Sequence, residues 1–264
     1  MAMTKEFEGL DKVMIDFSYV GRDLHGLAYQ KDEDTVEGRL FDALDKVNML
    51  KDLVSSRYER AARTDKGVHA LHNYCSFFVD PGFVLSLPDH LHRFYEFLKP
   101  SLVKFETDEE RNLFRQTRIS GMTRPINKHL PKYIRVNSIA IVPPNFSARG
   151  DCTYRIYKYY FQPENMDIYL MREACQYFVG HHNFTQFCKT DKRNPKDPNK
   201  TIYFFGIEKY NDLLHAAVIK GSSFLWHQVR CMMAVLFLVG KGTINAVEIK
   251  NMLERHDEEK MKFV

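Results

Sequence analysis

Apolar and polar residues alternate over several short stretches of the chain, and each alternation predicts a strand with one buried face. From Val13 to Tyr19, large apolar residues stand at every second position. Two faces also alternate from Leu71 to Val79, and from Thr153 to Phe161 the odd-numbered residues share one face. We predict further strands at 133–142, 201–210 and 213–220, and a short one just before residue 63.

Apolar residues spaced three or four apart predict helices between these strands. The first begins at Asp34 or Thr35, whose side chains suit a helix N-cap, and its apolar stripe ends at Val47. Ser86 and Pro88 open the second helix. The later predicted helices cover 166–179, 227–239 and 246–256.

The second half of the chain repeats the order of elements in the first half. We therefore predict an α+β fold of two similar α/β halves that share an extended, mainly antiparallel sheet, with a central cleft between them. Residues 1–103 would form the N-terminal half and 133–264 the C-terminal half. The charged residues 104–132 are interpreted as a linker or surface insertion, part helical around 108–118.

Composition narrows the class of protein. No stretch of the 264 residues approaches the roughly 18 apolar residues of a membrane helix, so we expect no membrane association. Residues 1–11 lack the apolar core of a secretory signal. The five cysteines lack paired spacing, which indicates a reducing compartment, and cytoplasm and nucleus both fit.

The net charge of +4 is only mildly basic, but the basic residues are clustered. One cluster recurs through 111–135. The other lies in a loop rich in proline and asparagine and comprises Lys189, Lys192, Arg193, Lys196 and Lys200. Clusters of this kind usually form solvated faces, and two in one chain also suit a path for phosphates.

The run Ala61–Ala70 places one carboxylate, Asp65, between Arg63 and Lys66 in a turn that ends at Gly67. Neighbouring cations favour the ionised carboxylate and fix its direction, so Asp65 is suited to act as a nucleophile or base. Most loop aspartates instead close an Asx turn. From the residues alone, the second interpretation is favoured.

Four collinear stretches resemble one family. Residues 61–70 resemble the signature of the TruA family of tRNA pseudouridine synthases, and 19–30, 146–159 and 221–230 agree with that family in order and approximate spacing. The resemblance runs from about residue 12 to about residue 243. Four motifs in order are a far more specific signal than one.

The resemblance implies an isomerase that converts uridine in tRNA to pseudouridine within an RNA-binding cleft. Uracil is detached from its ribose, rotated and rejoined through carbon. No electrons or external groups are exchanged, so no cofactor or metal is expected. The resemblance makes Asp65 the essential carboxylate, as nucleophile on the sugar or as base. It makes Arg63 the arginine that helps displace the target nucleotide and contacts phosphate.

Further site residues follow from the same resemblance in the second half of the chain. Tyr157 matches the tyrosine expected to stack on the target uracil, and Arg230 matches the arginine that pairs with Asp65. Phe224 and Leu225 would supply apolar pocket wall. Without the motifs, Tyr157 would be interpreted as a core residue and Arg230 as an arginine whose stem packs while its head reaches water.

Two adjacent histidines and a nearby cysteine raise the question of a metal site. His181, His182 and Cys188 do not have the spacing of a standard zinc site. We interpret residues 180–184 as a structural turn instead.

The motifs point to two branches of the family. Ala62 matches the broad-specificity eukaryotic branch, which acts on several tRNA sites and small nuclear RNA. Residues 187–189 and 226–240 match the eukaryotic branch that modifies tRNA positions 38 and 39 in the anticodon stem-loop. The longer match favours positions 38/39. A catalytically idle tRNA-binding protein or chaperone is the rival from another class.

The expected partner is tRNA, recognised largely by shape and phosphate contacts. The basic residues of 189–200 and of 111–132 are the candidates for those contacts. Bacterial members of the family are dimers and some eukaryotic relatives are monomers. A homodimer is therefore one expectation, although no exposed apolar stripe in the sequence marks an interface.

Overall fold

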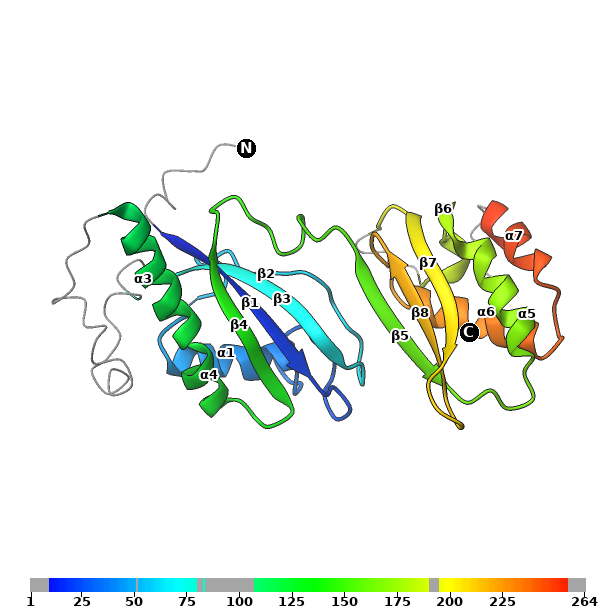
Figure 1. Cartoon of the computed structure of the whole chain (residues 1–264), viewed down its shortest axis with the longest axis horizontal. Helices are drawn as coiled ribbons and strands as arrows, with labels where there is room; N and C mark the ends of the chain where they lie inside the picture. The colour runs from blue at the N-terminus through cyan, green and yellow to red at the C-terminus, as the bar shows by residue number, and fades with distance from the viewer. Residues whose placement is uncertain (1–9, 51, 80–82, 84–106, 190–194, 256–264) are drawn as a thin grey trace. The chain divides into compact units, whose positions relative to one another are not determined.

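Two compact units, residues 1–152 and 153–264, make up the computed structural model of the chain (Figure 1). It describes residues 10–50, 52–79, 83, 107–189 and 195–255. Each unit contains one four-stranded antiparallel sheet together with helices. The predicted α+β class and antiparallel strands are confirmed. The single sheet shared by both halves and the central cleft stay predictions.

The first sheet has the strand order β2-β3-β1-β4. Its strands are β1 (Asp11–Tyr19), β2 (Glu59–Arg60), β3 (Ala70–Val79) and β4 (Ile134–Val142). In β1 the predicted apolar face is buried, with Val13, Ile15 and Phe17 at 0% exposure, but Lys12 and Asp16 on the other face are buried as well, so the strand is not half-buried as predicted. In β3 both faces are buried toward the C-terminal end, where the segment after β4 contacts the strand through Ala148 N, which donates to Ser76 Oγ at 3.2 Å.

Helices α1 (Val36–Lys46), α3 (Asp108–Gly121) and α4 (Thr123–His129) belong to the same unit. Thr35 is the N-cap of α1, as predicted, and its hydroxyl accepts from Gly38 N at 3.1 Å. Helix α3 begins with a capping box in which Thr107 and Glu110 each bond the other's backbone. The predicted helix that opens at Ser86 and Pro88 lies outside the described residues.

The predicted boundary between the halves is wrong. Strand β4 pairs with β1 along its length, so residues 134–142 belong to the first unit. The helix predicted around 108–118 is confirmed by α3, but residues 107–129 are not a linker, because α3 and α4 both pack against β4. Gln116 bonds both backbone groups of Ile141, and Asn127 bonds both of Val136. Most residues of α3 are charged or polar and only a narrow face of the helix is buried, so the sequence pattern did not predict this packing.

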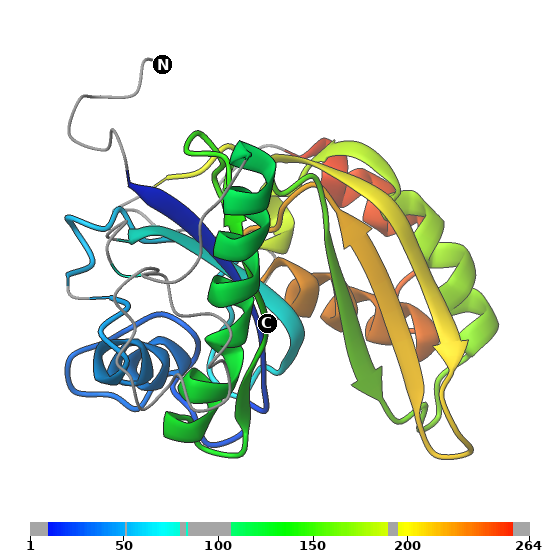
Figure 2. The ribbon, with the colours of Figure 1, turned by 60° about the vertical axis from the view of Figure 1, so that its left-hand side comes forward.

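The second sheet has the order β5-β8-β7-β6. Its strands are β5 (Arg155–Phe161), β6 (Gly180–Asn183), β7 (Asn199–Lys209) and β8 (His215–Gly221). Figure 2 shows that helices α5 (Ile168–Cys175), α6 (Gln228–Gly240) and α7 (Val247–Glu254) lie on one side of this sheet. Helix α6 is the most apolar, but no helix in the described part of the chain is long and apolar enough to span a bilayer.

Two predictions in this unit need correction. The α-helix predicted over 166–179 ends at Cys175 and continues as a single 3-10 turn, Gln176–Phe178. Residues 180–183 are not a turn but strand β6, which pairs with β7. Gly180 has φ +120, a conformation that residues with a side chain disfavour. A glycine in such a conformation is also typical of turns, which explains why the sequence suggested one here. The remaining strands and helices of the unit match their predicted positions within a few residues.

Candidate active site

The loop that carries Asp65 connects β2 to β3 in the first unit. Val68 N donates to Asp65 O at 3.2 Å, which closes a four-residue turn. Gly67 occupies the third position of this turn with φ +79, where glycine is strongly preferred. The Asp65 residue is half-buried, and the neighbouring Arg63 and Lys66 are exposed. The turn therefore presents one carboxylate flanked by two solvent-facing cations.

The N-terminal motif forms the support under this loop. Leu27 N donates to Thr64 O at 3.1 Å, and Gly67 N donates to Leu24 O at 3.3 Å. A Cβ on Gly21 would lie 2.1 Å from Val68 O, and one on Gly26 would lie 2.8 Å from the carbonyl oxygen of Thr64. Two motifs about forty residues apart in the chain are thus one structural site, and their glycines permit the close approach.

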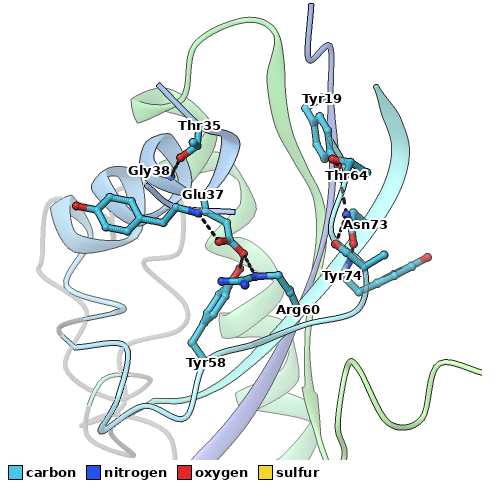
Figure 3. Close-up of polar contacts among 11 residues, drawn as sticks. Tyr19, Thr35, Glu37, Gly38, Tyr58, Arg60, Thr64, Asn73 and Tyr74 are labelled. Atoms are coloured by element: carbon cyan, nitrogen blue, oxygen red, sulfur yellow. Dashed lines mark hydrogen bonds and ion pairs between the residues drawn. The ribbon is translucent and has the colours of Figure 1, made fainter. Parts of the chain in front are cut away.

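A short polar network reaches the loop from the strands (Figure 3). The Tyr19 and Thr64 hydroxyls lie 2.7 Å apart. Asn73 Nδ2 donates to Ala62 O at 3.1 Å and to the Tyr19 hydroxyl at 3.3 Å. Tyr19 and Asn73 are buried, and burial raises the pKa of Tyr19 although its hydrogen bonds to Thr64 and Asn73 act in the opposite direction. Neither residue was among the candidates predicted from the sequence.

A buried carboxylate anchors β2, the strand that leads into the loop. Glu37 is fully buried at the start of α1. It accepts from Tyr29 N and from the Tyr58 hydroxyl, both at 2.9 Å, and from Arg60 Nε at 2.5 Å (Figure 3). Burial is the main cause that raises the pKa of Tyr58 well above its ordinary value. A buried charge needs such partners, so this cluster ties α1 to β2, the strand that leads into the Asp65 loop.

The second group of candidates lies in the second unit, around the loop from β8 to α6. The rings of Tyr157 on β5 and Phe224 meet edge to face, with centroids 5.0 Å apart. Arg155, on the same strand face, donates to Ser222 O at 2.7 Å. Tyr157 is half-buried, unlike a core tyrosine. One ring of this pair is therefore accessible in part to a ligand.

The start of α6 is built around a buried glutamine. Leu225 N donates to Gln228 Oε1 at 2.8 Å, and both residues are buried. His227, the residue before the helix, has φ +59 and makes no side-chain cap. Arg230 is exposed in the first turn of α6. Because the N-terminal end of a helix is electropositive, an anion bound near a cation there is stabilised by both.

The basic loop is described only in part. Lys192 and Arg193 lie outside the described residues. Lys189 and Lys196 are exposed, whereas the Lys200 ammonium bonds the carbonyls of Asp197 and Asn199 in its own loop. The Lys189 ammonium lies 5.8 Å from the centre of the Trp226 ring, and Trp226 is half exposed. Trp226 beside a lysine is a candidate that sequence reasoning missed.

Part of the middle basic cluster is structural. Arg118 is buried, with its guanidinium 5.5 Å from the centre of the Phe114 ring, and burial lowers its pKa. Arg115 pairs with Asp11. Arg135 donates to the carbonyls of Pro131 and Ile134. The side chains of these three arginines are thus engaged within the first unit.

The side chains of His181 and His182 both contact groups within the second unit. His181 Nδ1 lies 3.0 Å from the Thr201 hydroxyl, and His182 Nε2 donates to Val179 O at 3.0 Å. Within the described residues, no three His, Cys, Asp or Glu side chains gather as metal ligands.

Comparison with known proteins agrees with the motifs. The family model described as tRNA pseudouridine synthase matches residues 174–264. The tRNA pseudouridine synthase A of Methanosphaera stadtmanae is 31% identical over 248 residues, which cover 92% of this chain and 75% of that protein. The chain belongs to the TruA family of tRNA pseudouridine synthases.

Eukaryotic TruA relatives are more similar but longer. The tRNA pseudouridine(38/39) synthase of Saccharomyces cerevisiae is 35% identical over 238 residues, or 87% of this chain and 49% of that protein. The protein of the same name from Mus musculus is 36% identical over 248 residues, or 89% of this chain and 48% of that protein. The chain thus spans about half the length of these curated relatives.

Within this TruA fold, the candidate residues are divided between the units. Arg63 and Asp65 lie in the first unit, and Tyr157, Phe224, Leu225 and Arg230 lie in the second. The structure brings Tyr157 and Phe224 together and seats Leu225 one residue further along the same loop. A signal for the missed Asn73 was present in the sequence, because it is a polar residue on the apolar face of a predicted strand.

Proposed function

We propose that this chain is a tRNA pseudouridine synthase that isomerises uridine to pseudouridine at positions 38 and 39 of the anticodon stem-loop. The observation that carries the proposal is the 35% identity, across 87% of the chain, to a relative named for those positions. The same name recurs among the relatives from Mus musculus, Bos taurus and Homo sapiens. The enzyme would act where its tRNA lies, in the cytoplasm or nucleus.

The chemistry fits a site with one supported carboxylate. The bond between C1′ of the ribose and N1 of uracil breaks, and a bond from C1′ to C5 forms. C5 then loses its proton and N1 gains one, so no electrons are exchanged. Asp65 would act as the nucleophile or base, on a turn whose backbone is fixed by motif glycines and backbone hydrogen bonds. Such preorganisation lowers the cost of reaching the reactive geometry.

The other residues would handle the displaced nucleotide. Arg63 is exposed beside Asp65 and would help displace the nucleotide and hold its phosphate. The half-buried ring of Tyr157, braced by Phe224, would stack on the target uracil, with Leu225 as apolar wall. Arg230 would pair with the Asp65 carboxylate, an anion that the electropositive start of α6 would also favour.

Basic residues of the second unit would contact tRNA phosphates. Lys189 and Lys196 are exposed in the described part of the loop, and Lys192 and Arg193 belong to the same stretch of sequence. Lys200 is a weaker candidate because its ammonium is held by its own loop. The half-exposed Trp226 beside Lys189 would add a stacking surface for an unpaired base.

A homodimer would use the outer face of the second sheet, the side opposite its helices (Figure 2). Ile156, Tyr160 and Phe204 are each about half exposed there, at 54%, 47% and 52%. With neighbouring tyrosines they leave on the order of 600 Å² of ring and aliphatic surface, near the roughly 800 Å² per partner of a standard interface. The face also carries the Lys158–Glu208 ion pair, in which the two charges neutralise each other within one chain.

The deciding experiment is tritium release from tRNA labelled at uridine C5, with wild type and Asp65→Ala compared. We expect release by wild type and none by the variant, with tRNA binding retained by both. Mapping the product should place pseudouridine at positions 38 and 39; modification of many tRNA sites or of small nuclear RNA would favour the broad-specificity branch. Tight tRNA binding with no release by wild type would instead favour an idle binding protein.

A further inference from the structure

We infer that Asn73 and Tyr19 are positioning residues, which hold residues 62–64 so that Arg63 and Asp65 are presented in one orientation. This inference rests on the proposed function. It concerns two buried side chains that are placed in β3 and β1 and touch the segment just before Asp65.

The orientation of the Asn73 amide follows from its partners. Its Oδ1 accepts from Tyr74 N at 2.9 Å, and a backbone N–H can only donate. The amide nitrogen must therefore point the other way, toward Ala62 O at 3.1 Å and the Tyr19 hydroxyl at 3.3 Å. One side chain thus links the ladder of β3 to the chain that enters the Asp65 loop.

The next hydrogen bond continues the same network. The Tyr19 oxygen accepts from the amide of Asn73, and it lies 2.7 Å from Thr64 Oγ1, where either hydroxyl can be the donor. Burial raises the pKa of Tyr19, so its hydroxyl keeps its proton for this network. The network therefore runs from Asn73 through Tyr19 to Thr64, the residue next to Asp65.

The segment needs this support because the strand ladder stops short of it. The pairing of β2 with β3 covers Glu59 and Arg60, and Ala61 N adds one bond to Tyr74 O. Beyond that point the hold on residues 62–64 comes from Asn73, Tyr19 and the Leu27 amide. A misplacement of about 1 Å at a reacting group can lower turnover on the order of 100-fold.

Tyr19→Phe and Asn73→Ala test the inference. The first removes one oxygen and keeps the ring beside Phe17, 5.9 Å away between centroids. We expect kcat to fall about 10- to 100-fold in each, with KM within about threefold of wild type. Hydrogen exchange of the amides of 62–68 should be about 2- to 10-fold faster, while amides of the sheet are unchanged.

Asn127→Ala is the matched control. Asn127 also bonds a backbone N–H and a backbone C=O, both of Val136 at 2.8 Å, in the same unit but between α4 and β4. Its removal should lower thermal stability to a similar degree as Asn73→Ala. We expect its kcat and the exchange of 62–68 to remain at wild-type values, which a merely structural role for Asn73 would not predict.

The outcomes are distinguishable. Unchanged exchange of 62–68 in both variants, or faster exchange with an unchanged kcat, would overturn the positioning role. A Tyr19→Phe, Thr64→Val double variant should have the same kcat as the less active single variant, and additive reductions would also contradict the inference. Faster exchange of 62–68 in the variants, together with no turnover by wild type, would overturn the proposed function. The conclusion that Asn73 and Tyr19 hold the loop in place would then remain.

Discussion

At the scale of single residues, the candidate site depends on side chains whose roles differ from their appearance in the sequence. Tyr157 is one of 14 tyrosines, and only its motif singled it out. The structure adds that Tyr157 is half-buried and that its ring meets the ring of Phe224 edge to face. Tyr159, two residues along the same strand face, packs instead on Phe237 of α6. Neighbouring tyrosines of one strand thus have different surroundings.

This difference gives the first prediction. Tyr157→Leu keeps apolar bulk but removes the ring face, so kcat/KM should fall about 5- to 150-fold if the ring stacks on uracil. Tyr159→Leu removes a ring of the same strand face that contacts α6. It should lower the melting temperature and leave kcat/KM at the wild-type value. Steady-state assays of tritium release measure both. Equal reductions in the two variants would mean that Tyr157 acts through packing.

At the scale of elements, loops are fixed by contacts between segments that the sequence separates. The motif at 19–30 and the Asp65 loop pack backbone to backbone, with Gly26 at φ +89 facing Thr64 O. A hydrophobic pattern predicts strands and helices from local spacing, and it contains no information on which loops meet. The pairing of these two loops was therefore visible only in the structure.

A comparison of Gly26→Ala with Gly242→Ala distinguishes the cost of backbone strain from the cost of a steric clash. Both glycines have positive φ, at +89 and +68, but a Cβ on Gly242 meets no atom within 4 Å. Gly242→Ala should cost about 1 kcal/mol of unfolding free energy. Gly26→Ala should lower the free energy of unfolding by more than this and should lower kcat as well, because the added methyl group would clash with the carbonyl oxygen of Thr64. Urea unfolding and turnover assays would check this, and equal effects in both variants would contradict the close packing.

The basic loop gives a prediction about affinity. Lys189→Glu with Lys196→Glu should weaken tRNA binding and reduce the salt dependence of log Kd, by about 0.7 to 0.9 for each phosphate that the loop no longer neutralises. Lys209→Glu is the control, since Lys209 pairs with Asp212 in the β7–β8 hairpin. Filter binding between about 50 and about 200 mM salt measures the slope. An unchanged slope in the double variant would remove this loop from the RNA-binding surface.

At the scale of the whole molecule, titration links the buried clusters to global stability. Burial raises the pKa of Tyr58 well above its usual value and that of Cys75 to about 12. The pKa of Tyr19 shifts in the same direction. These groups keep their protons in the folded chain when the unfolded chain has released them. Lys12, whose pKa burial lowers, acts in the opposite direction.

Stability should therefore fall as the pH rises. An unfolded cysteine titrates near 9.0 and an unfolded tyrosine near 10.0, so unfolding releases protons above about pH 9. The free energy of unfolding should decrease by about 1.4 kcal/mol per pH unit for each group that has titrated only in the unfolded chain. Urea unfolding between about pH 8 and about pH 11 measures this slope. Tyr58→Phe should flatten it above about pH 10, and a pH-independent stability would contradict the buried titration.

The proposed assembly gives a second prediction at this scale. Ile156→Glu and Phe204→Glu place a carboxylate on the outer face of the second sheet and should convert a dimer into a monomer. Val54→Glu is the control, because Val54 is 84% exposed in the first unit and lies outside that face. Light scattering after size exclusion measures the mass, and circular dichroism checks the fold. A monomeric wild type at all concentrations would contradict the homodimer.

The sequence by itself determined the α+β class, most of the strand and helix positions and, through four motifs, membership of the TruA family. Periodicity suffices for this because burial of one face acts residue by residue along an element. The tertiary structure decided that residues 107–142 belong to the first unit, because β4 finds its partner in β1, far away in the chain. It also decided that Asn73 and Tyr19 contact residues 62–64, since hydrogen bonds between distant segments depend on the register of β1 with β3 and leave no spacing in the sequence.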